Sequence, residues 1–312
     1  MDFIAAADLH LTTETPQSRE EGYTKQILSK FEQILRITKN KTNSNLLVVA
    51  GDFFDSPHPS HVPYSLTTKV IEIINRYNVT IFVVPGQHDL RYHQKGLKNT
   101  PLGTLQAAGV VKILSEHEKT YHNIMPEYSF IGKGWNSEVK VMDADILVMH
   151  QMIIKNKLWK TQENGVTGKQ ILKKYPNFSY IISGDNHLPH LIKQNNRFQL
   201  NCGSIPRKNK TQIDYHPCVW KVNLEEKKIT KIKLKIKPKE VVFNFEKIEN
   251  HEKEDERKKQ ALEKIPKFIE KLFDGNKTSP KFPLILKQIV DETKPSIPVK
   301  IIINDTMERI SK

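Results

Sequence analysis

Acidic, histidine and amide side chains that can bind a metal follow five short apolar runs of the chain. The segments are Asp8–His10, Gly51–Asp55, Gly86–Asp89, His150 and Gly184–His187. Each apolar run is typical of a buried strand, and ligand crevices in α/β sheets form at the carboxyl ends of strands. The donors are oxygen and imidazole groups without a thiol, which suits Mn, Fe, Zn or Mg better than a structural zinc site. These segments therefore predict a two-metal hydrolytic site.

The spacing within the segments supports this interpretation. Asp8 and His10 are two residues apart, so both side chains point to one side as the chain leaves its strand. Gly51 lets the backbone turn tightly beside a metal. One carboxylate can bridge two ions that lie about 3.5–4 Å apart, and Asp52 is the predicted bridge.

The elements that position these residues alternate between strand and helix patterns. We expect strands at residues 3–7, 46–50, 81–84, 146–149 and 180–182. Residues 27–37 and 65–77 have apolar side chains at helical spacing. Alternation of this kind predicts an α/β fold in which helices cover the sheets.

The C-terminal part has a different pattern, which predicts a small α+β module at 229–312 after a main domain at 1–228. Residues 229–239 alternate between apolar side chains and lysines, as in a strand with one solvated face. The lysine face either follows phosphates or only deters edge-to-edge aggregation. Helices are expected at 249–273 and 282–291, and a last strand at 299–303.

The composition indicates a basic protein without a membrane span. The net charge is +14 over 312 residues, which favours polyanionic partners, nucleic acid first; a lysine-rich surface without a function is the alternative. No stretch approaches the roughly 18 to 20 apolar residues of a membrane helix. The N-terminus enters a strand without a basic leader, so we expect a cytoplasmic protein.

The order of the motifs resembles the calcineurin-like metallophosphoesterases, whose pattern is DxH … GDxxD … GNH[DE] … H … GHxH. Within that family the chain is most similar to SbcD-type double-strand-break repair nucleases and their phage-encoded relatives. The similarity lies in Gly51–Ser56, in His88–Leu90 and in Leu200–Arg207, and it covers residues 1–215. It implies a two-sheet β-sandwich flanked by helices, followed by a module where the nucleases carry a DNA-capping domain.

The resemblance also implies roles for individual residues. The implied metal ligands are Asp8, His10, Asp52, Gln87, His150, Asp185 and His187. His88 is the implied catalytic histidine beside the scissile phosphate, and Asp55 is expected to orient it. Arg207 belongs to the segment that follows the last motif and is an expected substrate contact. Arg91 and Lys95 lie close to the motifs in the sequence and are further candidates for phosphate binding.

Two positions depart from the family pattern, and both fall on the second metal. Gln87 stands where the family has Asn, and Asp185 stands where it has His. Gln keeps the carbonyl donor but is one methylene longer. Asp replaces a neutral nitrogen with an anionic oxygen, which favours hard ions. We therefore expect two divalent ions, with Mn favoured over Mg, Fe or Zn.

These observations favour a metal-dependent DNA nuclease, exonuclease or endonuclease. A phosphatase or a cyclic-nucleotide phosphodiesterase is one alternative, although Ser56 and Pro57 stand where phosphoprotein phosphatases usually have Arg-Gly. A nucleic-acid-binding subunit that has lost activity is the other, and only Gln87 and Asp185 favour it. The expected partners are DNA and, by resemblance, an SbcC-type coiled-coil ATPase or a second copy of this chain.

Overall fold

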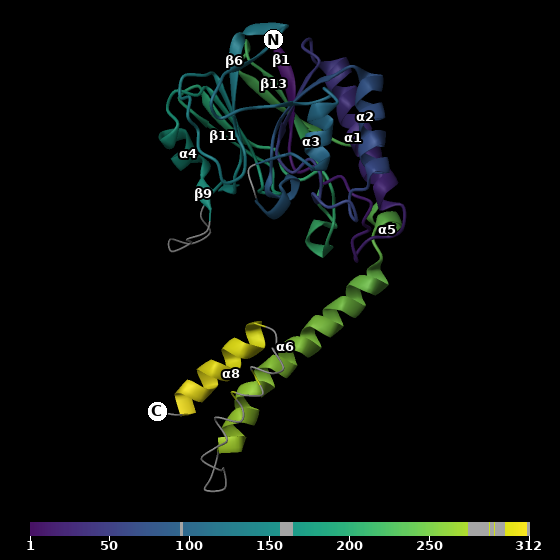
Figure 1. Ribbon diagram of the computed structural model, residues 1–312, viewed down its shortest axis with the longest axis vertical. Helices are drawn as coiled ribbons and strands as arrows, with labels where there is room; N and C mark the ends of the chain where they lie inside the picture. Colours follow the sequence, from purple (N-terminus) through teal and green to yellow (C-terminus); the bar gives the residue numbers. More distant parts are fainter. Residues whose placement is uncertain (94–95, 157–164, 274–286, 288–289, 291–296, 311–312) are drawn as a thin grey trace. The chain divides into compact units, whose positions relative to one another are not determined.

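The chain forms two compact units, Met1–Asn244 and Phe245–Lys312. The computed structural model describes residues 1–93, 96–156, 165–273, 287, 290 and 297–310. The first unit contains all the strands of the described chain, and the described part of the second unit is helical (Figure 1).

One six-stranded sheet carries the first three motifs. Its order is β14-β13-β1-β2-β3-β4. The strands are β1 (Asp2–Ala6), β2 (Leu46–Ala50), β3 (Thr80–Val84), β4 (Lys112–Ile113), β13 (Cys218–Asn223) and β14 (Lys228–Lys233). The first four run parallel, whereas β13 and β14 pair in antiparallel fashion. The carboxyl ends of β1, β2 and β3 therefore lie side by side.

A second six-stranded sheet carries the last two motifs. Its order is β11-β12-β10-β7-β6-β5. The strands are β5 (Thr120–His122), β6 (Met125–Lys133), β7 (Ile146–His150), β10 (Tyr180–Gly184), β11 (His190–Gln194) and β12 (Arg197–Asn201). The four central strands are parallel, and both edge strands are antiparallel. A separate pair, β8 (Ile153–Ile154) and β9 (Val166–Thr167), follows β7.

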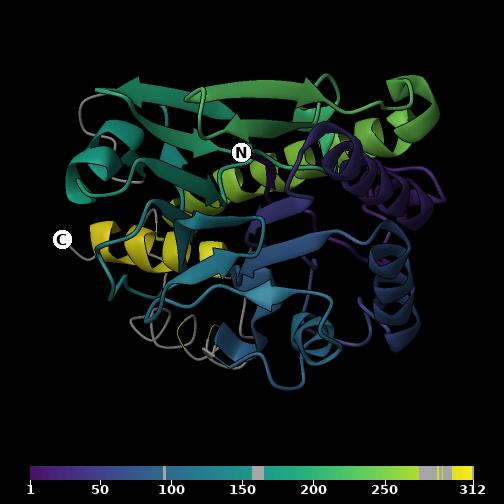
Figure 2. The same ribbon diagram turned by 90° about the horizontal axis from the view of Figure 1, so that it is seen from above.

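The two sheets pack face to face, and helices cover their outer faces (Figure 2). The helices α1 (Tyr23–Lys41), α2 (Tyr64–Tyr77) and α3 (Pro101–Ala107) cover the first sheet, and α4 (Gly168–Lys174) covers the second. Helix α1 buries Ile27, Phe31 and Ile34, which are spaced at one helical face. The predicted two-sheet α/β sandwich flanked by helices is confirmed.

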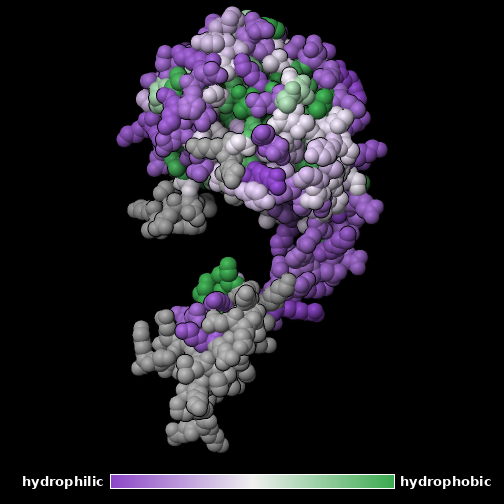
Figure 3. Space-filling view, viewed as in Figure 1, coloured by the Kyte–Doolittle hydropathy of each residue, from purple (hydrophilic) through white to green (hydrophobic). Residues whose placement is uncertain are grey.

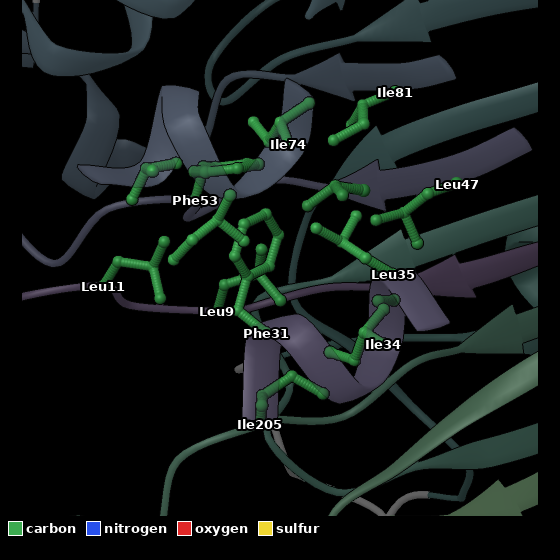
Figure 4. Close-up of a cluster of buried hydrophobic side chains, with 14 of the residues drawn as sticks. Leu9, Leu11, Phe31, Ile34, Leu35, Leu47, Phe53, Ile74, Ile81 and Ile205 are labelled. Atoms are coloured by element: carbon green, nitrogen blue, oxygen red, sulfur yellow. The ribbon is translucent and has the colours of Figure 1, made fainter. Parts of the chain in front are cut away.

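The loops that carry the motifs are anchored in this core. Leu9, Leu11 and Phe53 are fully buried beneath α1 (Figure 4), and the rings of Phe53 and Phe31 meet edge to face at 5.6 Å. Because these apolar residues alternate with polar motif residues, each loop places its polar side chains on the opposite side. The buried apolar residues therefore anchor these loops to the hydrophobic core.

The first unit extends further than the boundary expected after residue 228. Strand β14 pairs with β13 along its whole length, so the lysine-rich strand completes the first sheet instead of opening a new module. The ring of Phe243 then lies between two guanidinium groups, 4.8 Å from that of Arg19 and 5.5 Å from that of Arg207. Arg19 Nε also donates to the carbonyl of Val242 at 2.7 Å. These contacts attach the segment after β14 to the first unit.

The second unit differs from the predicted α+β module. Helix α6 (Phe245–Phe273) includes the helix expected at 249–273, and the visible face of its first part is hydrophilic (Figure 3). The strand expected at 299–303 is wrong, because this isoleucine-rich segment lies within α8 (Ile297–Ile310), which packs against α6. The local β-propensity of the isoleucines therefore does not decide the structure of this segment. The helix expected at 282–291 falls almost wholly outside the described residues.

Within the described part of the chain, no helix is both long and apolar enough to cross a bilayer.

Phe243→Ala is expected to lower the free energy of unfolding by about 3–5 kcal/mol, because it removes a buried ring from between two arginines. The measurement is urea unfolding followed by tryptophan fluorescence, since all three tryptophans lie before residue 244. The control is Val241→Ala in α5 (Lys239–Val242), where the side chain is 56% exposed and the change should stay within about 0.5 kcal/mol. Equal small effects would show that Phe243 does not anchor this segment.

Candidate metal centre

Strand ends of both sheets converge on one cluster of polar side chains. The backbone N–H of Asp8 donates to Gly51 O, and that of His10 donates to Asp52 O, both at 3.0 Å. Asp8, His10 and Asp52 have φ values of 51°, 45° and 49°, and Asp185 has 77°. This left-handed conformation is rare outside glycine. It turns each chain sharply at the point where its strand ends.

Three donors form the first half of the cluster. The ligand atoms of Asp8, His10 and His187 lie within 4.8 Å of one another. Burial lowers the pKa of His10 to about 4, against the opposing hydrogen bond of Asp55. The imidazole is therefore neutral, which is the form that binds metal. Its Nε2 is buried and has no hydrogen-bond partner in the described part of the chain.

A second group of three donors forms the second half of the cluster, and it shares Asp8 with the first group. The ligand atoms of Asp8, Asp52 and His150 also lie within 4.8 Å of one another. Asp52 Oδ2 lies 3.8 Å from His10 Nε2 and 3.4 Å from His150 Nε2. Although burial opposes it, the hydrogen bond and charge of His150 lower the pKa of Asp52 to about 2. Asp52 thus presents an ionised carboxylate between the imidazoles of the two halves, where a bridging ligand belongs.

The two residues that depart from the family pattern contact each other. Gln87 Nε2 donates to Asp185 Oδ1 at 3.2 Å, and Gln87 Oε1 lies 2.8 Å from His150 Nε2. The additional methylene of Gln lets its amide reach both partners. The backbone N–H of Asp185 also donates to Asp8, at 3.1 and 3.2 Å to its two oxygens. Both departures are therefore part of the second half of the cluster.

His88 is held at the rim of the cluster by backbone contacts. Its N–H donates to Asp52 Oδ1 at 3.0 Å, and its Nδ1 lies 2.8 Å from the main-chain carbonyl of Asp55. Because a carbonyl only accepts, Nδ1 carries the proton in this contact. The contact that orients His88 therefore comes from the main-chain carbonyl of Asp55. The sequence had suggested Asp55 for this role but not which of its atoms makes the contact.

The carboxylate of Asp55 has a different position. It lies 2.9 Å from His10 Nδ1 and forms an ion pair with Lys208. These partners outweigh burial and hold the pKa of Asp55 well below its usual range. A carboxylate on the remote nitrogen of a ligating histidine fixes the ring and raises its basicity. Lys208, which sequence reasoning missed, is thus a neighbour of the cluster; the only signal for it was its place beside Arg207.

Asp89 is a second residue whose role the sequence did not reveal. Its carboxylate is 1% exposed and accepts hydrogen bonds from the N–H groups of Phe53, Phe54 and Gly86 at 2.9–3.2 Å. Burial raises its pKa to about 7, and the three donors oppose that rise. The bonds tie the loop after β2 to the loop after β3. At Gly86 a Cβ would lie 2.0 Å from Asp52 Oδ1, so only glycine fits there.

The three predicted phosphate contacts have different outcomes. Arg207 is 3% exposed, and its guanidinium donates to the carbonyls of Ile213 and Lys237. This burial argues against a substrate contact. Arg91 is exposed at the surface, with its guanidinium 5.3 Å from the ring of Tyr92. Lys95 lies outside the described residues.

The donor set fits divalent metal ions. Asp8 and Asp52 are two carboxylates buried side by side, and burial raises the pKa of Asp8 to about 8. Carboxylates in such surroundings need a cation, and the unpartnered Nε2 of His10 faces the same place. Asp8, His10 and His187 would hold one ion, His150, Gln87 and Asp185 the other, and Asp52 would reach both.

Comparisons with known proteins agree with this geometry. The model of the family described as calcineurin-like phosphoesterase matches residues 1–189. The SbcD component of the SbcCD nuclease of Staphylococcus epidermidis is 30% identical over 107 residues, or 33% of this chain and 28% of that protein. The DNA double-strand break repair protein Mre11 of Methanopyrus kandleri is 23% identical over 178 residues, or 49% and 38%. The chain thus matches well under half the length of these relatives.

A solved structure from Thermus thermophilus covers 74% of this chain and 98% of its own, at 10% identity and a TM-score of 0.48.

The contact between Gln87 and Asp185 predicts that the two departures are coupled. Gln87→Asn and Asp185→His should each weaken binding of Mn²⁺ to the second half, because each leaves the other side chain without its partner. The double variant should bind better than the sum of the single effects predicts, with a coupling of about 0.5–3 kcal/mol. Isothermal titration calorimetry measures it, with Gln151→Asn as the control beside His150. Strictly additive effects would contradict the coupling.

Proposed function

This chain belongs to the calcineurin-like phosphoesterase family, and on that premise we propose that it is a metal-dependent DNA nuclease. The position of the Asp52 carboxylate is the observation that carries the proposal. Its Oδ2 lies between the imidazoles of His10 and His150, and its Oδ1 accepts a hydrogen bond from the backbone N–H of His88. This arrangement suits cleavage of a phosphodiester. The SbcD and Mre11 relatives and the net charge of +14 support DNA as the substrate.

The expected cofactors are two divalent ions, with Mn²⁺ first because oxygen ligands predominate in the second half. When bound, such ions neutralise phosphate charge and lower the pKa of a coordinated water. Asp55 supports this indirectly, because its carboxylate fixes the ring of His10.

His88 acts on the leaving group in this proposal. Its Nδ1 proton is engaged with the carbonyl of Asp55, so Nε2 is the atom that exchanges a proton with substrate. This step needs His88 with protons on both ring nitrogens. As the water oxygen forms its bond to phosphorus and releases a proton to solvent, the opposite phosphorus–oxygen bond breaks. The leaving oxygen takes the Nε2 proton, and the neutral ring keeps its proton on Nδ1. A positioned general acid of this kind contributes roughly 10²- to 10⁴-fold to the rate.

An SbcC-type coiled-coil ATPase is the proposed protein partner, with a second copy of this chain as the other candidate. The ATPase is supported by the likeness to the SbcD component of an SbcCD nuclease. The matched segment covers 28% of that SbcD protein.

The test is digestion of end-labelled linear duplex and single-stranded DNA with Mn²⁺. His88→Ala should lower the rate by roughly 10²- to 10⁴-fold without changing metal binding. His61→Ala serves as the control, because its imidazole is about half exposed and lies outside the cluster. Cleavage of a chromogenic phosphodiester but not of DNA would favour the small-substrate phosphodiesterase or phosphatase. DNA binding without cleavage of either substrate, at full metal occupancy, would favour the non-enzymatic subunit.

A further inference from the structure

A hollow of about 930 Å³ opens beside the second half of the metal centre. His150 and Asp185 are among the residues that line it. The cationic and aromatic side chains that line it are Lys133, Trp135, Lys140, Lys174 and Tyr175. A ligand that reaches the cluster from this side must therefore pass basic and aromatic groups.

Lys133 has an unusual environment for a lysine. It is the last residue of β6, paired in register with Met149 of β7, and only 8% of it is exposed. No hydrogen bond or ion pair of its ammonium group occurs in the described part of the chain. Burial, and then the charge of Lys174, lower the pKa of Lys133. Lysines are mostly exposed, so a lysine with so little exposed area is unusual.

The hollow also contains three acidic side chains, Glu116, Glu138 and Asp185. Glu138 is paired with Lys140 at 3.5 Å, and none of the three forms an ion pair with Lys133 or Lys174 in the described part of the chain. Lys174 ends α4, where a cation also favours the helix dipole, and its ammonium group lies 5.4 Å from the ring of Tyr175. Lys133 and Lys174 thus form a pair of like charges that an anion would satisfy.

We propose that Lys133 and Lys174 bind the backbone phosphate next to the one that is hydrolysed, in an oligonucleotide that extends through this hollow. This inference rests on the proposed function, and it adds a subsite for a second phosphate. Trp135 lines the same hollow and offers a ring on which a base can stack. Such a subsite distinguishes a polynucleotide from a substrate with a single phosphate.

The kinetic test compares two substrates that differ in this second phosphate. Bis(p-nitrophenyl) phosphate has one phosphate, and an eight-residue oligothymidylate has several. Lys133→Met should lower kcat/KM for the oligonucleotide by about 10- to 100-fold, as for a lost charged hydrogen bond, and leave the chromogenic diester within about twofold. Lys193→Met, at an exposed position of β11 in the same sheet, should change neither. Equal losses on both substrates, or no loss on either, would overturn the subsite.

A binding test separates this inference from the proposed function. The probe is the same oligonucleotide with a fluorescent label, titrated by anisotropy in EDTA at several salt concentrations. Loss of one phosphate contact should reduce the slope of log K against log salt by about 0.7. An unchanged slope in Lys133→Met overturns the subsite even if DNA is cleaved; a reduced slope supports it even if no cleavage occurs. Displacement of the probe by millimolar inorganic phosphate would instead assign the site to free phosphate and overturn the proposal.

Folding does not obscure these measurements. Because Lys133 is 8% exposed and its ammonium group has no partner in the described part of the chain, Met in its place should keep or raise the unfolding temperature. A merely structural lysine would show the opposite. Lys174→Gln, at the end of α4, gives a second and more exposed variant. It should reduce oligonucleotide cleavage in the same direction and leave the diester unchanged, and a failure of both variants to do so would overturn the inference.

Discussion

The buried carboxylate of Asp89 is the interaction on which the geometry of the metal centre depends. Three N–H groups from two loops donate to it, and those loops carry Asp52, Gln87 and His88. A buried ion is costly unless hydrogen bonds satisfy it, so the loops stabilise the carboxylate while it holds them together. The bond from His88 N–H to Asp52 Oδ1 then closes the same unit from the other side. The distance between the carboxylate of Asp52 and His88 is thereby set by the backbone.

Backbone strain is concentrated at the same place. Asp8, His10, Asp52 and Asp185 all adopt the left-handed conformation, which costs about 1–2 kcal/mol for each residue outside glycine. Such strain persists only where the surrounding structure holds it. Leu9 and Phe53, fully buried between these residues and α1, provide that support. The core beneath the site therefore does more than stabilise the fold: it keeps the ligands turned toward one another.

Much of the fold was predictable, because buried parallel strands produce apolar runs that end in turns with functional residues. The strands β2, β7 and β10 were recognisable in this way, and their alternation with helices predicted an α/β fold. The two-sheet sandwich was implied by the resemblance to the family. The boundary at residue 244 was not predictable from the sequence. It depends on contacts of Phe243 with Arg19 and Arg207, which are far from it along the chain. Likewise the segment 299–303 has strand propensity, yet it is helical within α8, which contacts α6.

The site shows the same division between local and long-range information. Motif spacing predicted that Asp8, His10, Asp52 and His150 converge, and they do. It could not predict that the Asp55 carboxylate contacts His10 and Lys208, because that contact depends on how separate loops pack.

The unusual ligands of the second half also have a consistent electrostatic explanation. Asp185 adds an anionic oxygen where the family pattern has a neutral imidazole, and this extra charge would repel a phosphate. Gln87 donates a hydrogen bond to that oxygen, which stabilises the carboxylate without cancelling its charge. Lys133 and Lys174 line the hollow that contains Asp185, and both are cations without an acidic partner in the described part of the chain. The two lysines outnumber the one additional carboxylate, so the departures from the family pattern are compatible with an anionic substrate.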